Sequence, residues 1–290
     1  MVKTVQFTEK VPISHHLIEL KDRLIRVALV VAVFFGLSFY FIDFLLLWLQ
    51  DPLPPKYAEL TFITPTEPFF TAMKVSFMGS IFISMPMILY QVWEFISPGL
   101  KVKEKKITFM FVAFGTLFFL MGGIFCYFLV LPLGLKFLLT YGVNWWKMQV
   151  TIGFYFSFVV KLILAFAFAF QTPLLMVLLT KFGLVNTVKM RFYRKWAFLG
   201  AFALSAVLTP PDIITQVLLA VPLYGLYEFG VVVSRWFEDP KVRARVEKEM
   251  ALQEEMRKAK QKAAGSAKKT KAGAGKRTDK KPTGSQKAST

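Results

Sequence analysis

The chain has 290 residues, of which 55% are hydrophobic and 32 are phenylalanine, and it carries a net charge of +18. Soluble domains contain roughly 45–50% apolar residues even when glycine is counted, so this composition excludes an ordinary soluble globular protein. The single cysteine, Cys126, lies inside an apolar run and has no partner in the chain for a disulfide. We therefore expect the solvent of this protein to be a lipid bilayer.

Long apolar runs predict helices that cross a membrane, because a hydrocarbon core of about 30 Å needs ~20 apolar residues in helical conformation. We predict an all-α polytopic membrane protein with six spans, at Ile25–Leu46, Val75–Phe95, Ile107–Leu131, Phe154–Leu179, Trp196–Leu208 and Ile213–Val233. The fifth span reaches only about 20 Å at 1.5 Å per residue. The sixth is also short before Glu228 interrupts it. A re-entrant hairpin and two short crossings both fit this region.

Charge sorts the connecting segments into two classes. Cations gather between spans two and three and between spans four and five, at Lys101, Lys103, Lys105, Lys106, Lys181, Lys189, Arg191, Arg194 and Lys195. Because basic loops stay on the cytoplasmic side, we predict that both termini and these two loops are cytoplasmic. The acid-containing N-terminus lacks a cleavage site after the first span, which favours an uncleaved anchor in the prokaryotic cytoplasmic (inner) membrane.

This topology divides the chain into three parts. We predict a cytoplasmic N-terminal segment with an interfacial helix at 1–24 and a six-helix membrane domain at 25–237. A basic cytoplasmic tail, partly disordered, is predicted at 238–290. On the other side of the membrane, the proline-rich segment 47–73 predicts a structured cap, since proline cannot continue a helix interior.

No catalytic or metal-binding set emerges from the sequence, which indicates a protein that is not an enzyme and needs no cofactor or metal. Two polar residues lie within predicted spans. Gln171 needs a hydrogen-bond partner in hydrocarbon, and Glu228 is more expensive to bury and should face protein or water. Because such residues also suit a solute path, a small-molecule secondary transporter is the alternative function.

Two glutamates stand out at the predicted cytoplasmic surface, where cations predominate. Glu19 precedes the first span, and Glu104 lies within a lysine-rich loop. A carboxylate accepts two parallel hydrogen bonds from a guanidinium, so two spaced glutamates suit a ligand with paired arginines. The alternative is a local role, in which Glu19 pairs with Arg23 at i,i+4 and Glu104 offsets neighbouring lysines.

At these residues the chain resembles a known family, TatC, the multispanning receptor subunit of the twin-arginine protein translocase. The likeness runs over roughly residues 14–237. The matching segments are 14–24 (SHHLIELKDRL), 68–70 (PFF), 86–100 (PMILYQVWEFISPGL), 104–106 (EKK), 125–128 (FCYF) with Pro132, and 208–212 (LTPPD) with Gln216.

The resemblance implies a receptor for the Arg-Arg motif in signal peptides of folded export cargo. It assigns the recognition site to Glu19 and Glu104 and associates Phe95 and Pro52 with function. It also implies contact of Gln171 with single-span TatA-like and TatB-like partners, within homo- and hetero-oligomers in membrane lipid and without nucleic acid. Asp212, Gln216 and Glu228 are further candidates for partner contact or for a structural polar role.

The chain departs from the family at two of these positions. Many members have glutamate where this chain has Gln171, and an amide cannot titrate, so the resemblance does not carry over a protonation switch. Lys21 stands where arginine is common, and lysine lacks the bidentate fork of a guanidinium.

Overall fold

The computed structural model describes residues 13–57, 59–96, 105–140, 149–209 and 212–238, with residues 240, 244, 246, 248, 252, 255 and 256. It divides into two units after Phe237. The first unit is helical, and its elements are α1 Ile13–Tyr40, α2 Ile42–Gln50, the 3-10 turn η1 Pro55–Tyr57, α3 Glu67–Ile96, α4 Lys105–Phe125, the π-helical turn η3 Cys126–Val130, α5 Leu131–Thr140, α6 Ile152–Ala169, α7 Gln171–Lys181, α8 Thr187–Phe192, α9 Arg194–Leu208 and α10 Ile213–Phe237.

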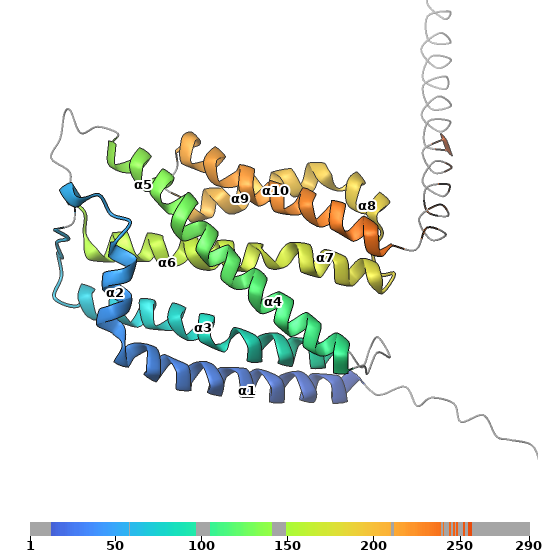
Figure 1. Cartoon of the computed structure of the whole chain (residues 1–290), viewed down its shortest axis with the longest axis horizontal. Coiled ribbons are helices and arrows are strands. Elements are labelled where there is room, and N and C mark those ends of the chain that lie inside the picture. The colour runs from blue at the N-terminus through green and yellow to red at the C-terminus, as the bar shows by residue number, and fades with distance from the viewer. Residues whose placement is uncertain are drawn as a thin grey trace, which may run out of the picture. The chain divides into compact units, whose positions relative to one another are not determined.

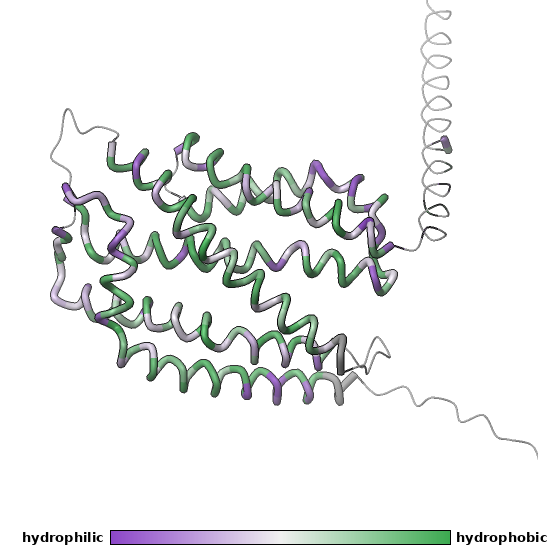
Figure 2. The backbone as a smooth tube through the Cα atoms, viewed as in Figure 1, coloured by the Kyte–Doolittle hydropathy of each residue, from purple (hydrophilic) through white to green (hydrophobic). Residues whose placement is uncertain are grey.

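Within the described residues, the helices long and apolar enough to span a membrane lie at Leu17–Tyr40, Glu67–Ile96, Thr108–Thr140, Ile152–Lys181 and Ile213–Phe237. Helix α9, with 15 residues, supplies a shorter apolar pass. Hydrophilic residues gather mainly near the helix ends, and apolar residues cover their lengths (Figure 2). The predicted all-α polytopic membrane fold is confirmed.

The helices of this unit pack in a continuous series. Helix α1 packs on α3, which also contacts α4 and α6, while α10 packs on both α7 and α9. The start of α1 and the end of α10 lie at the same end of the unit (Figure 1). We call this the Glu19 end, and we call the opposite end, where α1 gives way to α2, the α2 end.

Several helices differ in extent from the predicted spans, and α3, for example, begins at Glu67 and not at Val75. The first run breaks at Phe41, so the residues at 42–46 belong to α2 and not to α1. The third pass continues beyond its predicted end through η3 into α5. Helix α10 reaches Phe237 with 25 residues, longer than predicted, and Glu228 within it pairs with Arg194.

The α6–α7 break has a clear local cause. Proline lacks an N–H, and its ring clashes with the carbonyl four residues earlier. For Pro173 that carbonyl belongs to Ala169, the last residue of α6. The helix therefore breaks at Phe170, and α7 begins at Gln171. Gln171 is thus the first residue of α7.

Glycine permits a close contact between α4 and α6. A Cβ added at Gly122 would lie 2.7 Å from the Phe166 carbonyl oxygen and 2.8 Å from the Ala167 Cα. Those atoms are backbone and cannot move aside as a side chain can. Small residues let membrane helices approach in this way, where van der Waals packing drives their association.

Tyrosine hydroxyls organise the α2 end. The last four carbonyls of a helix lack an intrahelical donor. Tyr127 donates to the Trp48 oxygen at 2.7 Å and Tyr155 donates to the Leu49 oxygen at 2.8 Å, so both satisfy the end of α2. Pro52 follows directly and is half-buried, next to the buried Leu53.

Candidate functional site

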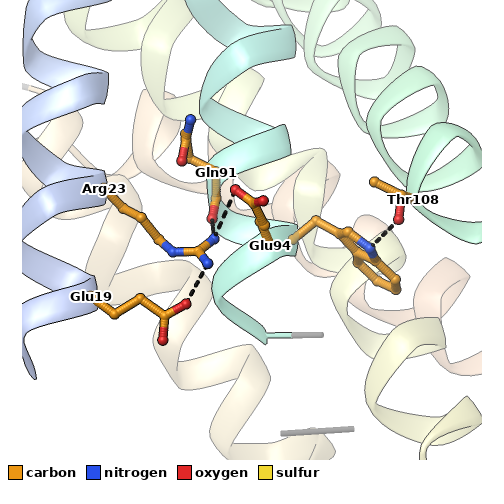
Figure 3. A network of polar contacts seen from close by, with 6 residues as sticks. Glu19, Arg23, Gln91, Glu94 and Thr108 are labelled. Atoms are coloured by element: carbon orange, nitrogen blue, oxygen red, sulfur yellow. Dashed lines mark hydrogen bonds and ion pairs between the residues drawn. The ribbon is translucent and has the colours of Figure 1, made fainter. Parts of the chain in front are cut away.

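A polar cluster lies at the Glu19 end, where α1 and α3 run side by side. Glu19 and Arg23 are one turn apart on α1, and Gln91 and Glu94 are three residues apart near the end of α3 (Figure 3). Residues at these spacings share one helix face. Packing of α1 on α3 therefore brings four polar groups from distant parts of the sequence together.

The Arg23 guanidinium is the centre of this cluster. Its Nη2 donates to Glu19 Oε1 at 2.5 Å, and its Nη1 donates to Glu94 Oε2 at 3.3 Å. The same Nη1 also donates to the Gln91 backbone oxygen at 3.2 Å. One planar guanidinium thus binds two carboxylates on two helices through a fixed fork, which the compact ammonium of lysine lacks.

Burial differs among the three charged side chains. The Arg23 side chain is 11% exposed, whereas those of Glu19 and Glu94 are 27% and 42% exposed. The cation therefore lies inside and the anions face outward. With two carboxylates and one guanidinium, these three residues have a formal charge of −1, and they form an anionic patch in a chain of net charge +18.

The neighbouring helix α4 is fixed to α3 beside this patch. Trp93 is buried, its Nε1 donates to Thr108 Oγ1 at 2.7 Å, and its ring packs on Phe111. Phe95 is half-buried near the end of α3. Glu104 lies outside the described residues and directly precedes α4 in the sequence. The structure thus places Glu19 and Phe95 at the Glu19 end and leaves the position of Glu104 untested.

The i,i+4 pairing of Glu19 with Arg23, one of the two sequence interpretations, is present. It accompanies a surface location for Glu19 and does not exclude a binding role. Sequence reasoning missed Glu94 as a member of the cluster. A signal was available, because the predicted span Val75–Phe95 contained this one acid, and a carboxylate within a span requires a partner.

Glu228 belongs to a second arginine cluster. Its Oε2 accepts from Arg194 Nη2 at 2.7 Å, and its Oε1 accepts from the Tyr224 hydroxyl at 2.7 Å. Arg194 begins α9 and Glu228 lies on α10. These contacts tie the two helices together, and Tyr227 ties α10 to α8 by donating to the Met190 oxygen at 2.6 Å.

Asp212 and Gln216 support the other end of α10. Asp212 Oδ1 accepts from the Thr215 backbone N–H at 2.7 Å, the contact of an N-cap residue. Gln216 Nε2 donates to the Phe202 oxygen of α9 at 3.2 Å. Asp212 therefore caps α10, and Gln216 joins α10 to α9.

Gln171 is buried between α4 and α7. The residue is 8% exposed, and its side-chain Nε2 donates to the backbone oxygen of Gly115 at 3.0 Å. A neutral amide supplies this donor at any pH, whereas a glutamate in its place would need a proton to do so. Gln171 and Glu228 therefore make contacts with different helices, and neither residue belongs to the cluster around Arg23.

Metal binding finds no support in the residues that are described, where no group of three or more His, Cys, Asp and Glu side chains converges. The arrangement at the Glu19 end instead suits a cationic ligand, because partly exposed carboxylates are held there by a buried guanidinium.

Fold and site together define a multi-pass α-helical membrane protein with an anionic patch at one end of its helices. The sequence model of the family described as Sec-independent protein translocase protein (TatC) matches residues 15–222. This chain belongs to the TatC family, as its sequence motifs predicted.

Individual relatives agree with this assignment. The Sec-independent protein translocase protein TatC of Halothiobacillus neapolitanus is 40% identical over 230 residues, which cover 78% of this chain and 63% of that relative. The protein of the same name from Escherichia coli (strain K12) is 37% identical over 229 residues, covering 78% of this chain and 89% of the relative. A solved structure described as the crystal structure of the twin arginine translocase receptor TatC superimposes with a TM-score of 0.71 at 36% identity, covering 77% of this chain and 99% of that one.

Proposed function

We propose that this chain is the twin-arginine signal-peptide receptor and core membrane subunit of a Sec-independent translocase that exports folded proteins. The observation that carries the proposal is the anionic patch at the Glu19 end, in a chain 36% identical to a twin arginine translocase receptor. Glu19 and Glu104 bind the two arginines of the signal peptide. Phe95 contributes an apolar contact beside them.

The chemistry of this role is hydrogen bonding between ions. A guanidinium and a carboxylate form two parallel N–H···O bonds, roughly twice as strong as neutral ones. An ammonium cannot form that pair, so a site made of carboxylates at fixed positions discriminates arginine from lysine. Arg23 fixes Glu19 by a 2.5 Å contact and so supplies the required rigidity.

Orientation follows from the cations. Lys189, Arg191, Arg194 and Lys195 lie in α8 or at the start of α9, at the Glu19 end. Because Lys and Arg stay on the cytoplasmic side, the Glu19 end faces the cytoplasm and both chain ends are cytoplasmic. The protein then lies in the prokaryotic cytoplasmic (inner) membrane, where signal peptides reach it before export.

The remaining roles concern assembly. TatA-like and TatB-like single-span proteins bind along the membrane faces, with Gln171 helping to position them, and further copies of the chain join the complex. Pro52, Asp212 and Gln216 shape the α2 end and the α9–α10 pair. The protein acts by binding and not by catalysis. A solute path, the alternative function, would need Gln171 and Glu228 to face a common route, yet they bind Gly115 and Arg194 in separate helix pairs.

Crosslinking tests the proposed function. A twin-arginine signal peptide carrying a photoreactive group is added to membranes containing the wild-type chain or the double variant Glu19→Ala with Glu104→Ala. We expect the crosslinked product to disappear in the double variant and to persist in Glu59→Ala, which removes an exposed carboxylate between α2 and α3. Unchanged crosslinking in the double variant would remove both glutamates from the role.

A further inference from the structure

Arg23 binds two carboxylates, of which the sequence singled out only Glu19. Each accepts through one oxygen from the same guanidinium, Glu19 at 2.5 Å and Glu94 at 3.3 Å, and Glu94 is the more exposed of the two, at 42% against 27% for Glu19. Since one guanidinium bridges both contacts, the two anionic groups lie as close together as a single arginine head group allows. Any cation that approaches Glu19 therefore also meets the field of Glu94.

We infer that Glu94 is a further binding residue for a signal-peptide guanidinium, and that Arg23 is the positioning residue that holds it beside Glu19. This inference rests on the proposed function. It extends the site from one helix to two, with one carboxylate from α1 and one from α3. The ligand class is an arginine side chain, bound by carboxylates whose positions are set before it arrives.

Charge balance supports the inference. If Glu19 were alone with Arg23, the pair would be neutral and would have little attraction for a cation. The second carboxylate gives these three groups a formal charge of −1. Glu94 therefore places a second anionic group beside the Glu19–Arg23 pair, and this group attracts a cation that approaches Glu19.

Burial of Arg23 argues that it stays in place when the ligand binds. Its Nε is buried without a hydrogen-bond partner, and its side chain is only 11% exposed. Displacement by a peptide arginine would leave this desolvated charge without its anions, which is strongly unfavourable. The peptide guanidinium therefore adds to the cluster from the exposed side of the carboxylates and does not replace Arg23.

The experiment compares two peptides on the full-length chain in lipid nanodiscs. One is a fluorescent signal peptide with the Arg-Arg motif, and the other carries Lys-Lys at the same positions. The variants are Glu94→Gln, Glu94→Asp and Arg23→Lys. The matched control is Asp22→Asn, which removes an equal charge from the same end of α1, at a carboxylate that is 52% exposed and pairs with Lys21.

We expect Glu94→Gln to weaken binding of the Arg-Arg peptide about tenfold, because a hydrogen bond to a charged group is lost. Binding of the Lys-Lys peptide should change much less, so the preference for arginine shrinks. Glu94→Asp should recover part of the loss, since it restores the charge. Arg23→Lys should also reduce the preference, because an ammonium lacks the planar fork that sets the relative positions of the two carboxylates, and Asp22→Asn should leave it unchanged.

Two results would overturn the inference. Equal weakening of both peptides by Glu94→Gln would mean that Glu94 only ties α3 to α1. Tighter binding of the Arg-Arg peptide by that variant would mean that the Arg23–Glu94 contact competes with the ligand. Failure of the proposed function is a separate result, in which the wild-type chain binds both peptides equally.

Discussion

Two arginines connect helices at the Glu19 end, and their surroundings differ. Arg23 on α1 is 11% exposed and binds two carboxylates, one on its own helix and one on α3. Arg194 on α9 is 43% exposed and binds one carboxylate, Glu228 of α10, whose other oxygen accepts from a tyrosine hydroxyl. The first cluster has a formal charge of −1, and the second is neutral.

This difference distinguishes the proposed binding site from the Arg194–Glu228 pair, which we call the neutral clamp because it only joins α9 to α10. A neutral pair completed by a hydroxyl satisfies its own groups and has no charge left to attract a ligand. The cluster around Arg23 has one buried cation and two more exposed carboxylates. An Arg–Glu pair alone therefore says little about whether a cluster can bind a cationic ligand. The number of carboxylates around the arginine and the burial of that arginine say more.

The largest expected effect is on stability. Arg23→Gln leaves two carboxylates side by side without their cation, and we expect it to lower the free energy of unfolding by about 3 kcal/mol, as for a largely buried ion pair broken on one side. Arg194→Gln should lower it by ~1 kcal/mol or less, because this pair is more exposed. Denaturant titration of both variants in mixed micelles measures the difference. Equal losses would contradict the contrast drawn between the clusters.

Exchanging the partners sharpens the comparison. The double variant Arg194→Glu with Glu228→Arg should recover most of the stability lost by either single change, because the Tyr224 hydroxyl can accept from an arginine as well as donate to a glutamate. The double variant Arg23→Glu with Glu19→Arg should stay well below wild type, since it places the new carboxylate next to Glu94. Thermal unfolding measures the stability of each variant. Full recovery of stability in both double variants would show that Arg23 needs only one carboxylate partner.

A smaller effect is expected at the cap of α10. Asp212→Ala removes the acceptor for the Thr215 N–H, and we expect a loss of about 1 kcal/mol in unfolding free energy. Affinity for an Arg-Arg peptide should not change, because the cap lies at the start of α10, at the opposite end of that helix from the Glu19 end. Asp212→Asn keeps an acceptor and serves as the control. A large drop in peptide affinity for the alanine variant would link the two regions.

The smallest effect concerns Gln171. Gln171→Leu removes one hydrogen bond to the Gly115 oxygen inside the helix bundle, and such bonds average about 0.6 kcal/mol in membrane proteins. We expect a loss of that size, with no change in peptide binding and no dependence on pH. If the variant abolished peptide binding, Gln171 would have to be coupled to the cluster around Arg23.

Sequence reasoning anticipated much of the fold, because the requirement for apolar helices in a bilayer leaves few alternatives. It located each of the long apolar helices among the described residues, although it treated α6 and α7 as one continuous span. It did not anticipate the break at Phe41, where no proline or glycine marks the turn. It also expected a shorter α10, since it could not see that Arg194, from another helix, would pair with Glu228.

The candidate site shows the same limit: contacts within one helix could be predicted from the sequence, and contacts between distant helices could not. Glu19 and its i,i+4 contact with Arg23 could be read from the spacing along one helix. The contact of Arg23 with Glu94 joins residues 71 positions apart, and periodicity within α1 or α3 carries no information about it. Only the packing of the two helices reveals that Glu94 belongs with Glu19.

The most direct test of the account is a double-mutant cycle between the chain and its ligand. The peptide change is Arg-Arg to Lys-Lys, and the chain changes are Glu19→Gln in one cycle and Glu228→Gln in the other, with dissociation constants measured in nanodiscs. The account predicts a coupling energy of about 1.5 kcal/mol or more for Glu19 and one within ~0.5 kcal/mol of zero for Glu228. Coupling near zero for Glu19, or equal coupling for both glutamates, would contradict it.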